Sequence, residues 1–267
     1  MNYGTYLSTG SVLASMRRMD VIANNLANAN TVGFKPDLVS AAERPAERLE
    51  GLSPLSDPLA PPQEMLERLG GGIKFNPDRI DFRQGAFEQT GNATDLALHG
   101  EGFFVLAPAN GKKPDPKAPT DLTRAGNLTV DADGTLRTIG TRRALLGENG
   151  EPIKIDPKRP FAVDKAGRIF QGDSEVARFR IVKALTPASL EKVGANTFRS
   201  PPGSKLERVD ENSTSVEQRS LEQSLADPVT SMVELMRQSR MLEANVRMIQ
   251  YQDNLTGQAI TGITRNV

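Results

Sequence analysis

The 267-residue sequence contains no cysteine and no tryptophan, and it has a single histidine. Without cysteine the chain can form neither disulfides nor thiolate metal sites, so its fold depends on noncovalent packing. Because a second histidine is also absent, we expect no transition-metal centre. Apolar residues make up 37% of the sequence and aromatic residues 5%. This is a lean supply for one core, so we expect much of the chain to lie outside a single compact globule.

The sequence also has no excess of either charge, because 33 basic residues balance 33 acidic residues. Neither a basic stripe nor an acidic tail is present, so nucleic acid and membrane surfaces are not expected partners. No apolar run approaches the length of a membrane span, which argues against membrane insertion. The segment Met1–Tyr6 shows no basic region followed by an apolar core, so we expect no cleaved secretory signal. These features predict a cytoplasmic protein unless export uses another kind of signal.

The N-terminal segment has the apolar spacing of a helix and ends in an asparagine-rich stretch. We expect a helix over residues 1–34, with breaks near Gly4 and Gly10. Its apolar residues recur three or four positions apart: Val12, Met16, Met19, Ala23 and Leu26. Its last turns hold four asparagines: Asn24, Asn25, Asn28 and Asn30. Asparagine is disfavoured by roughly 0.5 kcal/mol in a helix interior. We therefore interpret the stretch as a close-packed contact rather than a frayed helix end, with Gly33 ending the helix at positive φ.

Residues 36–72 are rich in proline and are predicted to be a linker or arm. A short helix is expected within it at Pro62–Leu69, because proline opens that segment and glycines follow it. Residues 73–210 show short alternating runs separated by glycine, aspartate and asparagine, which predict a central antiparallel all-β domain. The expected strands are Asp95–Leu98, Gly102–Leu106, Asn127–Val130, Thr135–Arg137 and Phe179–Val182.

Two segments of the central region share one pattern, apolar–x–Val–Asp–x–x–Gly–x–apolar. They are Leu128–Leu136 and Phe161–Ile169. Aspartate opens a type I turn and glycine takes the left-handed position, so each segment is predicted to form a hairpin.

Residues 211–267 contain the second assembly helix, expected over about residues 227–255. Asp227 can cap its N-terminus and Pro228 suits the first helical position. A narrow seam alternates steps of three and four: Met232, Leu235, Ser239, Leu242, Val246 and Ile249. A helix of this span is roughly 40 Å long, so its partner must be equally long. The N-terminal helix is the comparable candidate, which predicts an α+β fold whose terminal helices pair as a coiled coil beside the central β domain.

Two helices leave apolar and asparagine-bearing faces uncovered, so we expect them to pack on copies of the chain or on sister chains. The predicted assembly interface comprises Val12, Met16, Met19, Ala23, Asn24, Asn25, Leu26, Asn28, Met232, Leu235, Leu242, Val246 and Ile249. In this interpretation Asn24, Asn25 and Asn28 supply hydrogen bonds that fix the register of packing.

No pattern in the sequence predicts catalysis. His99 is interpreted as a solvated turn residue. Asp131–Gly134 resembles the start of a calcium loop but lacks the later ligands, so we interpret it as a hairpin turn. No nucleophile or pair of carboxylates can be assigned to acid–base chemistry. We therefore expect a protein that is not an enzyme and that has no cofactor and no metal site.

The segment Ala23–Lys35 resembles the N-terminal signature of bacterial flagellar rod and hook proteins. The segments similar to the central domain of that family are Asp81–Gly85 with Gln89–Asn92, Asp95–Phe104 and Thr123–Leu136. Leu221–Ile249 resembles its C-terminal helix. The chain departs from the family pattern at Leu225-Ala226, where Asn-Val is usual, and it matches less well in residues 36–62 and after Lys154. Its length favours a rod protein over the larger hook protein.

The resemblance implies a structural subunit of the flagellar basal-body rod, the axial drive shaft. In that family the terminal helices pair into an inner coiled-coil tube and the β domains form the outer wall. The implied partners are copies of the same chain, sister rod and hook axial proteins, and the flagellar type III export apparatus. The implied location is the periplasm-spanning rod, reached without a cleaved signal peptide. The alternative is a trimeric secreted β-rich surface or phage-tail-like protein whose terminal helices merely trimerise it.

Overall fold

A computed structural model describes residues 3–43, 72–108, 119–209 and 213–264 of the chain. Most of the predicted proline-rich arm, including the expected helix Pro62–Leu69, lies outside the described residues. The contacts divide the chain into two units. The helical unit contains residues 1–27, 37–79 and 228–267, and the β unit contains residues 28–36 and 80–227.

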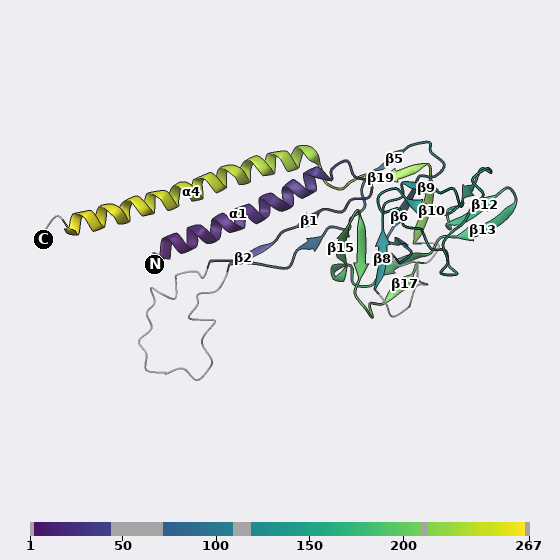
Figure 1. Cartoon of the computed structure of the whole chain (residues 1–267), viewed down its shortest axis with the longest axis horizontal. Helices are drawn as coiled ribbons and strands as arrows, with labels where there is room; N and C mark the ends of the chain where they lie inside the picture. Colours follow the sequence, from purple (N-terminus) through teal and green to yellow (C-terminus); the bar gives the residue numbers. More distant parts are fainter. Residues whose placement is uncertain (1–2, 44–71, 109–118, 210–212, 265–267) are drawn as a thin grey trace, which may run out of the picture. The chain divides into compact units, whose positions relative to one another are not determined.

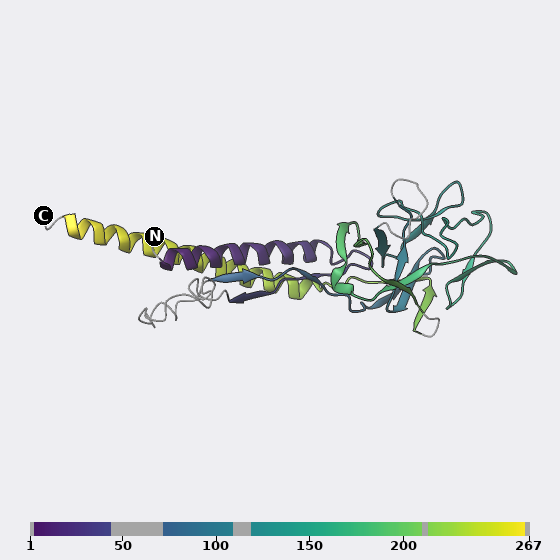
Figure 2. The same cartoon turned by 90° about the horizontal axis from the view of Figure 1, so that it is seen from below.

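The helical unit is built from the two ends of the chain. Its helices are α1 (Tyr3–Ala27) and α4 (Pro228–Thr264), which contact each other along their lengths. They run antiparallel, so that the start of α1 lies beside the second half of α4 (Figures 1 and 2). At 1.5 Å per residue, the 25 residues of α1 and the 37 of α4 span about 37 Å and about 55 Å. The predicted pairing of the terminal helices is confirmed.

Two details of the helix prediction are wrong. α1 continues without a break through Gly4 and Gly10, and it ends at Ala27 rather than near residue 34. α4 begins at Pro228 as expected but continues to Thr264, beyond the predicted end. Both glycines lie on a long helix that packs against another element, and tertiary packing outweighs the roughly 1 kcal/mol propensity cost of a glycine.

Short strands complete the helical unit and its boundary. They are β1 (Asp37–Leu38), β2 (Ala41–Glu43), β3 (Ile73–Phe75) and β4 (Arg79–Ile80). β2 pairs with β3 in antiparallel register, and both β1 and β3 contact α1. Arg17 of α1 lies over the ring of Phe75 and pairs with Asp78 at 2.8 Å. The segments that follow α1 therefore return along its side.

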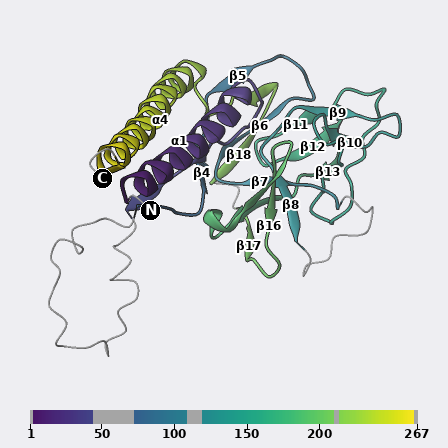
Figure 3. The same ribbon diagram turned by 60° about the vertical axis from the view of Figure 1, so that its left-hand side comes forward.

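The β unit is antiparallel, as predicted. Its strands are β5 (Phe87–Gln89), β6 (Leu96–Gly100), β7 (Phe103–Val105), β8 (Thr120–Thr123), β9 (Leu128–Val130), β10 (Leu136–Thr138), β11 (Ala162–Val163), β12 (Arg168–Gln171), β13 (Ser174–Arg178), β14 (Ile181–Ala184), β15 (Glu191–Gly194), β16 (Thr197–Ser200), β17 (Leu206–Arg208), β18 (Thr214–Gln218) and β19 (Ser220–Glu222), with a 3-10 helix at Pro187–Ser189. The largest sheet has the order β15-β16-β8-β7-β14-β17. Smaller sheets are β11-β12-β13, β9-β10, β6-β18 and β5-β19. Figure 3 shows β6 beside β18 and β7 beside β8.

The central strand β7 supplies two hydrophobic cores at once. Successive side chains of a strand point to opposite faces. Phe104 and Leu106 enter a cluster with Leu96, Leu136 and other buried residues, whereas Phe103 and Val105 enter a second cluster. The continuous apolar run around β7 is thus explained by a strand that is buried on both faces.

Both predicted hairpins are present. β9 pairs with β10, and β11 pairs with β12, in antiparallel register. In the first turn the amide of Gly134 donates to Asp131 O at 2.8 Å and Gly134 has φ 76°. In the second, the amide of Gly167 donates to Asp164 O at 3.0 Å and Gly167 has φ 77°. The Asp131–Gly134 segment is therefore the predicted hairpin turn.

Candidate functional site

The contact between α1 and α4 uses one narrow row of α4. The less exposed residues of this row alternate steps of four and three: Ser231, Leu235, Gln238, Leu242, Asn245, Ile249 and Gln252. Near the far end, a Cβ on Gly4 would lie only 2.8 Å from Gln252 Nε2, so α1 approaches the row closely there. We refer to this row as the α4 seam. It has the spacing of a coiled coil, with apolar and polar positions alternating along it.

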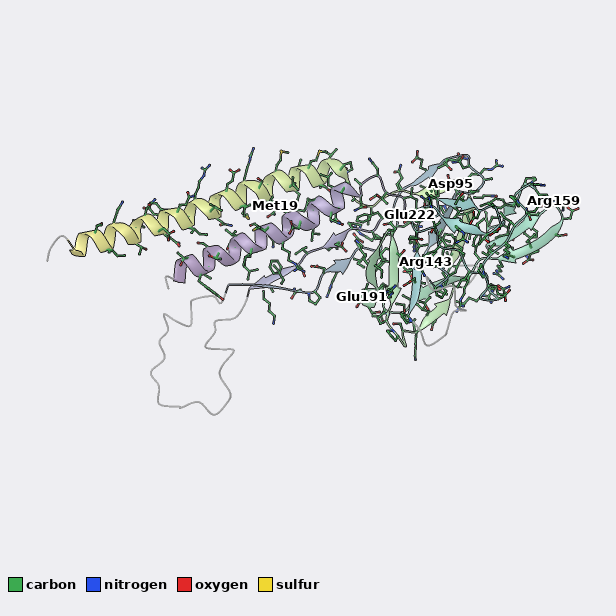
Figure 4. All side chains as sticks on the ribbon, in the orientation of Figure 1. Met19, Asp95, Arg143, Arg159, Glu191 and Glu222 are labelled. Atoms are coloured by element: carbon green, nitrogen blue, oxygen red, sulfur yellow. The ribbon has the colours of Figure 1, made fainter. Side chains whose placement is uncertain are left out.

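The predicted interface residues fall into two groups. Eight are at least partly covered within the chain: Val12, Met19, Asn25, Leu26, Asn28, Leu235, Leu242 and Ile249. Five are exposed: Met16, Ala23, Asn24, Met232 and Val246. Three of the predicted residues of α4 therefore belong to its seam, and Met232 and Val246 lie outside it. Met19 is labelled on α1 in Figure 4.

Several large apolar side chains of the two helices are exposed. At the start of α4, four of them lie within two turns and are each more than half exposed: Val229, Met232, Val233 and Met236. We call these four residues the α4 start patch. A second exposed row follows later in the same helix: Met241, Met248, Tyr251 and Leu255. On α1 the exposed large side chains are Tyr6, Leu13 and Met16. Contiguous exposed apolar surface of this kind marks interaction sites.

The asparagine-rich stretch is split between the two units. In the helical unit, Asn25 Nδ2 donates to Asp37 O at 3.0 Å, and the Asp37 amide donates to Asn25 Oδ1 at 3.1 Å. This side chain thus satisfies both backbone groups of Asp37, in the manner of a neighbouring strand. In the β unit, the Thr31 amide donates to Asn28 O at 3.0 Å, and the Thr31 hydroxyl donates to Asn28 Oδ1 at 3.2 Å. The amides of Asn25 and Asn28 are therefore engaged within the chain.

Residues 32–36 are bound into the β unit through three backbone carbonyl groups. Asn196 Nδ2 donates to Val32 O at 2.6 Å, and the Leu225 amide donates to Phe34 O at 3.2 Å. The Asp81 amide donates to Pro36 O at 2.9 Å.

Gly33 has the predicted positive φ, 66°, but it does not end the helix, because α1 stops at Ala27. Its amide donates to Glu222 O at 2.7 Å. This segment, which follows α1, is therefore bound to the segment that precedes α4.

A buried ion pair lies at the centre of this attachment. Lys35 is 0% exposed, and its Nζ lies 2.6 Å from Glu222 Oε1, whose side chain is 1% exposed. Lys35 also donates to Arg83 O, and Glu222 accepts from the amide of Gly85 at 2.9 Å. Arg124 lies 3.4 Å from the other carboxylate oxygen of Glu222. Figure 4 labels Glu222 among the densely packed side chains of the β unit.

Burial lowers the pKa of the Lys35 ammonium, and the adjacent Glu222 carboxylate opposes that shift. Neither Lys35 nor Glu222 is predicted from the sequence to be a functional residue. A lysine after a Gly-Phe pair and a glutamate in a polar strand carry no periodicity that indicates burial. The one signal in the sequence is that Lys35 belongs to the N-terminal signature Ala23–Lys35.

His99 lies in β6 rather than in a turn, and its ring stacks on Phe87 with centroids 3.8 Å apart. Its Nε2 lies 2.5 Å from Glu217 Oε2 on the adjacent strand β18. Within the described residues no group of three or more histidine or acidic side chains could hold a metal ion. No helix in that part of the chain is long and apolar enough to cross a membrane.

Two protein-family models match the chain, one at each end. The model described as "Flagella basal body rod protein" matches residues 14–35, which span the second half of α1 and the segment bound by Glu222. The model described as "Flagellar basal body rod FlgEFG protein C-terminal" matches residues 217–261, which contain Glu222 and most of α4. The matched segments therefore contain about half of α1, most of α4 and both residues of the buried ion pair.

Comparison with curated proteins gives similarity over the full length. The flagellar basal-body rod protein FlgF of Caulobacter vibrioides is 30% identical over 267 residues, with 97% of each chain covered. The rod protein FlgG of Agrobacterium fabrum is 28% identical over 254 residues, covering 91% of this chain and 92% of the relative. The hook protein FlgE of Treponema pallidum is 40% identical over 129 residues, but only 24% of that protein is covered.

Proposed function

This chain belongs to the family of flagellar basal-body rod proteins, and from that premise we propose that its paired helices are the surface through which subunits join. The chain is a structural subunit of the rod and is not an enzyme. We propose that its neighbours are further copies of itself and related rod and hook proteins. In this proposal α1 and α4 carry the assembly contacts and the β unit forms the outer part of the structure.

The exposed apolar side chains of the helices are the observation that carries this proposal. Burying a Val, Leu or Met side chain fully is worth roughly 1.5–3 kcal/mol. The α4 start patch alone has four such side chains in contiguous positions. A second row, which includes Met248 and Leu255, continues along the helix. These residues gain most of their stabilisation only when another molecule covers them.

The polar positions of the α4 seam support a role in fixing geometry. Gln238 and Gln252 each have a buried side-chain oxygen with no hydrogen-bond partner among the described residues. Polar groups at the contact between helices select one register and one partner number at a cost in stability. Repetition of one defined contact is what a rigid shaft requires, because it transmits torque through many identical joints.

We also propose that the chain reaches the rod unfolded, through the flagellar export apparatus. The absence of cysteine supports this route, because no disulfide has to form or be reduced on the way. Mass spectrometry of the chain in isolated basal bodies tests it: an intact N-terminus is expected, and a truncated N-terminus would contradict it.

The assembly proposal is tested by charging the α4 start patch. Met232→Asp should leave the helix pair intact, because Met232 lies outside the seam and is 52% exposed. It should abolish motility, since the carboxylate cannot be buried against an apolar neighbour. The matched control is Val176→Asp in β13, an apolar residue that is 44% exposed in the β unit. This control should assemble and swim normally.

A second pair of variants, Leu242→Asp and Ile249→Asp, addresses the seam itself. Each places a charge between α1 and α4 and leaves the β unit unchanged. Rod assembly should therefore fail, while the circular dichroism of the β unit stays the same. Normal motility of Met232→Asp would exclude the α4 start patch as an assembly contact. A stable trimer of the purified chain at low concentration would favour instead a protein whose helices only trimerise it.

A further inference from the structure

A groove of about 410 Å³ opens in the helical unit between α1, α4 and the chain around β1. Its apolar walls are Val21 and Ile22 of α1 on one side and Leu38 and Val39 on the other. Leu38 is 52% exposed, so this wall is uncovered. The volume is sufficient for one large side chain of another molecule.

Gln238, one of the residues that line the groove, carries a covered hydrogen-bond acceptor without a partner. Gln238 of the α4 seam is only 6% exposed, and its Oε1 has no donor among the described residues. A buried acceptor without a partner costs roughly 1–3 kcal/mol. The other amide of the groove, Asn25, is already bound to Asp37. The groove therefore combines apolar walls with one hydrogen-bond acceptor that lacks a donor.

We propose that the groove receives Tyr251 from a second copy of this chain. A tyrosine has an apolar ring that suits the walls and a hydroxyl that can donate to Gln238 Oε1 once the Gln238 amide turns toward the groove. The sequence contains no tryptophan, the other large apolar side chain with a donor. Tyr251 is 61% exposed on α4. Tyrosines in pockets of this kind are frequent anchors of protein interfaces.

Tyr251 suits the role better than Tyr6, the other tyrosine whose exposed side chain is described. Met248 and Leu255 precede and follow Tyr251 by three and four positions, so they share its face and are also exposed. Tyr6 has Thr9 and Gly10 at the equivalent following positions. Only the Tyr251 row offers a continuous apolar strip to a partner.

The ring must come from another molecule. Tyr251 follows Gln238 by more than three turns of the same helix, about 20 Å along its axis. The groove and the tyrosine are therefore separate surfaces of one chain. A two-fold pair could join them twice and close, so the proposal further specifies a heterologous contact, in which each copy gives its tyrosine to one neighbour and receives one from another. Such contacts produce open helical assemblies when they do not close into a ring, which is the geometry of a shaft.

Charge favours the same pairing. The groove is bordered by the carboxylates of Asp37 and Glu234 and by one guanidinium, Arg18. Arg247 lies one turn before Tyr251, and its side chain is 80% exposed, with Glu243 at 4.0 Å as a loose partner. A second copy that inserts Tyr251 brings Arg247 to a border with an excess of carboxylates.

This inference rests on the assembly proposal, and an experiment with engineered cysteines separates the two. Because the chain has no cysteine, Leu38→Cys combined with Tyr251→Cys introduces the only thiols. Oxidation of basal bodies from motile cells should give a ladder of linked chains, since each copy donates to one neighbour and receives from another. Each single variant, and the matched pair Leu38→Cys with Tyr6→Cys, should remain unlinked.

Motile cells that give no ladder, or an equal ladder from the Tyr6 pair, would overturn the groove assignment. The assembly proposal would survive that outcome, because it is tested separately by Met232→Asp. If the cysteine pair abolishes motility, the variant Tyr251→Phe tests the groove assignment instead. Loss of the tyrosine hydroxyl should weaken the contact between copies about tenfold. Adding Gln238→Leu to Tyr251→Phe should restore the strength of that contact. Adding Gln252→Leu instead should not restore it. Equal behaviour of the two glutamine variants would overturn the proposal.

Discussion

Lys35 and Glu222 are 187 positions apart in the sequence and form a buried ion pair, with Nζ 2.6 Å from Oε1. Lys35 follows α1 and Glu222 precedes α4, so the pair joins the two segments that lead to the helices. Burying two charges costs several kcal/mol each, and their attraction offsets this only in good geometry. The pair therefore adds little net stability, but it strongly specifies where the two segments leave the β unit.

Removing one charge of the pair should destabilise the β unit strongly. Lys35→Met leaves the Glu222 carboxylate buried, with Arg124 at 3.4 Å as its remaining ionic partner. Loss of one partner from a buried pair costs about 3–5 kcal/mol. Urea unfolding of the full chain, followed by circular dichroism, should show the corresponding fall in the transition midpoint.

The matched control for this substitution is Lys183→Met. Lys183 pairs with Glu101 at the surface, where the two side chains are 46% and 74% exposed. Solvent and salt screen such a pair, so its loss should leave the midpoint unchanged within error. Equal midpoints for Lys35→Met and Lys183→Met would contradict the specifying role of the buried pair.

Gly33→Ala should be more damaging than its small size suggests. The residue has φ 66°, and an added Cβ would lie 2.8 Å from Arg124 O and 2.9 Å from Arg124 C. The left-handed conformation costs an alanine roughly 1–2 kcal/mol, and the backbone contact adds to this. Gly10→Ala in α1 is the control, because nothing lies within 4 Å of its Cβ. We expect lower stability for the first variant and equal or higher stability for the second, measured by thermal unfolding.

The β unit could be predicted well from local sequence. The turn residues Asp131 and Gly134 specify a hairpin by their own backbone preferences, and the strands flank them as expected. Other features could not be predicted, because they depend on contacts across the sheet. His99 is an example: it is assigned to a turn by its neighbouring glycines, but pairing with Ser215 of β18 keeps it in β6.

The helices show a different limit of sequence reasoning. The apolar pattern located α4 and three of its seven seam residues, namely Leu235, Leu242 and Ile249. It could not separate residues that face α1 from residues that are exposed, such as Met232, because both kinds are apolar. The apolar pattern also failed to identify Gln238 and Gln252, because a search for regularly spaced apolar residues does not detect polar seam positions.

Asn25→Ala should loosen the chain after α1 locally. The amide accepts from and donates to the backbone of Asp37, at 3.1 and 3.0 Å. Losing both bonds at a part-buried site costs about 1–3 kcal/mol. Hydrogen exchange at the Asp37 amide should therefore accelerate. Asn30→Ala, in the exposed turn after the helix, serves as the control, and an equal rate in both variants would exclude the role of Asn25.

Stability of the β unit should fall in acid through Asp121. Burial raises the pKa of this carboxyl, but hydrogen bonds from Arg199 and Arg143, at 2.8 and 2.7 Å, outweigh it and leave the pKa below its usual range. The unfolded chain thus binds a proton more readily, so the stabilisation is complete above about pH 4 and is lost as the pH falls through the lower, folded value. Asp121→Asn should flatten this dependence in urea unfolding measured between pH 3 and 6. Asp173→Asn, at an exposed turn, should retain the wild-type slope; an unchanged slope in Asp121→Asn would assign the acid sensitivity to other carboxylates.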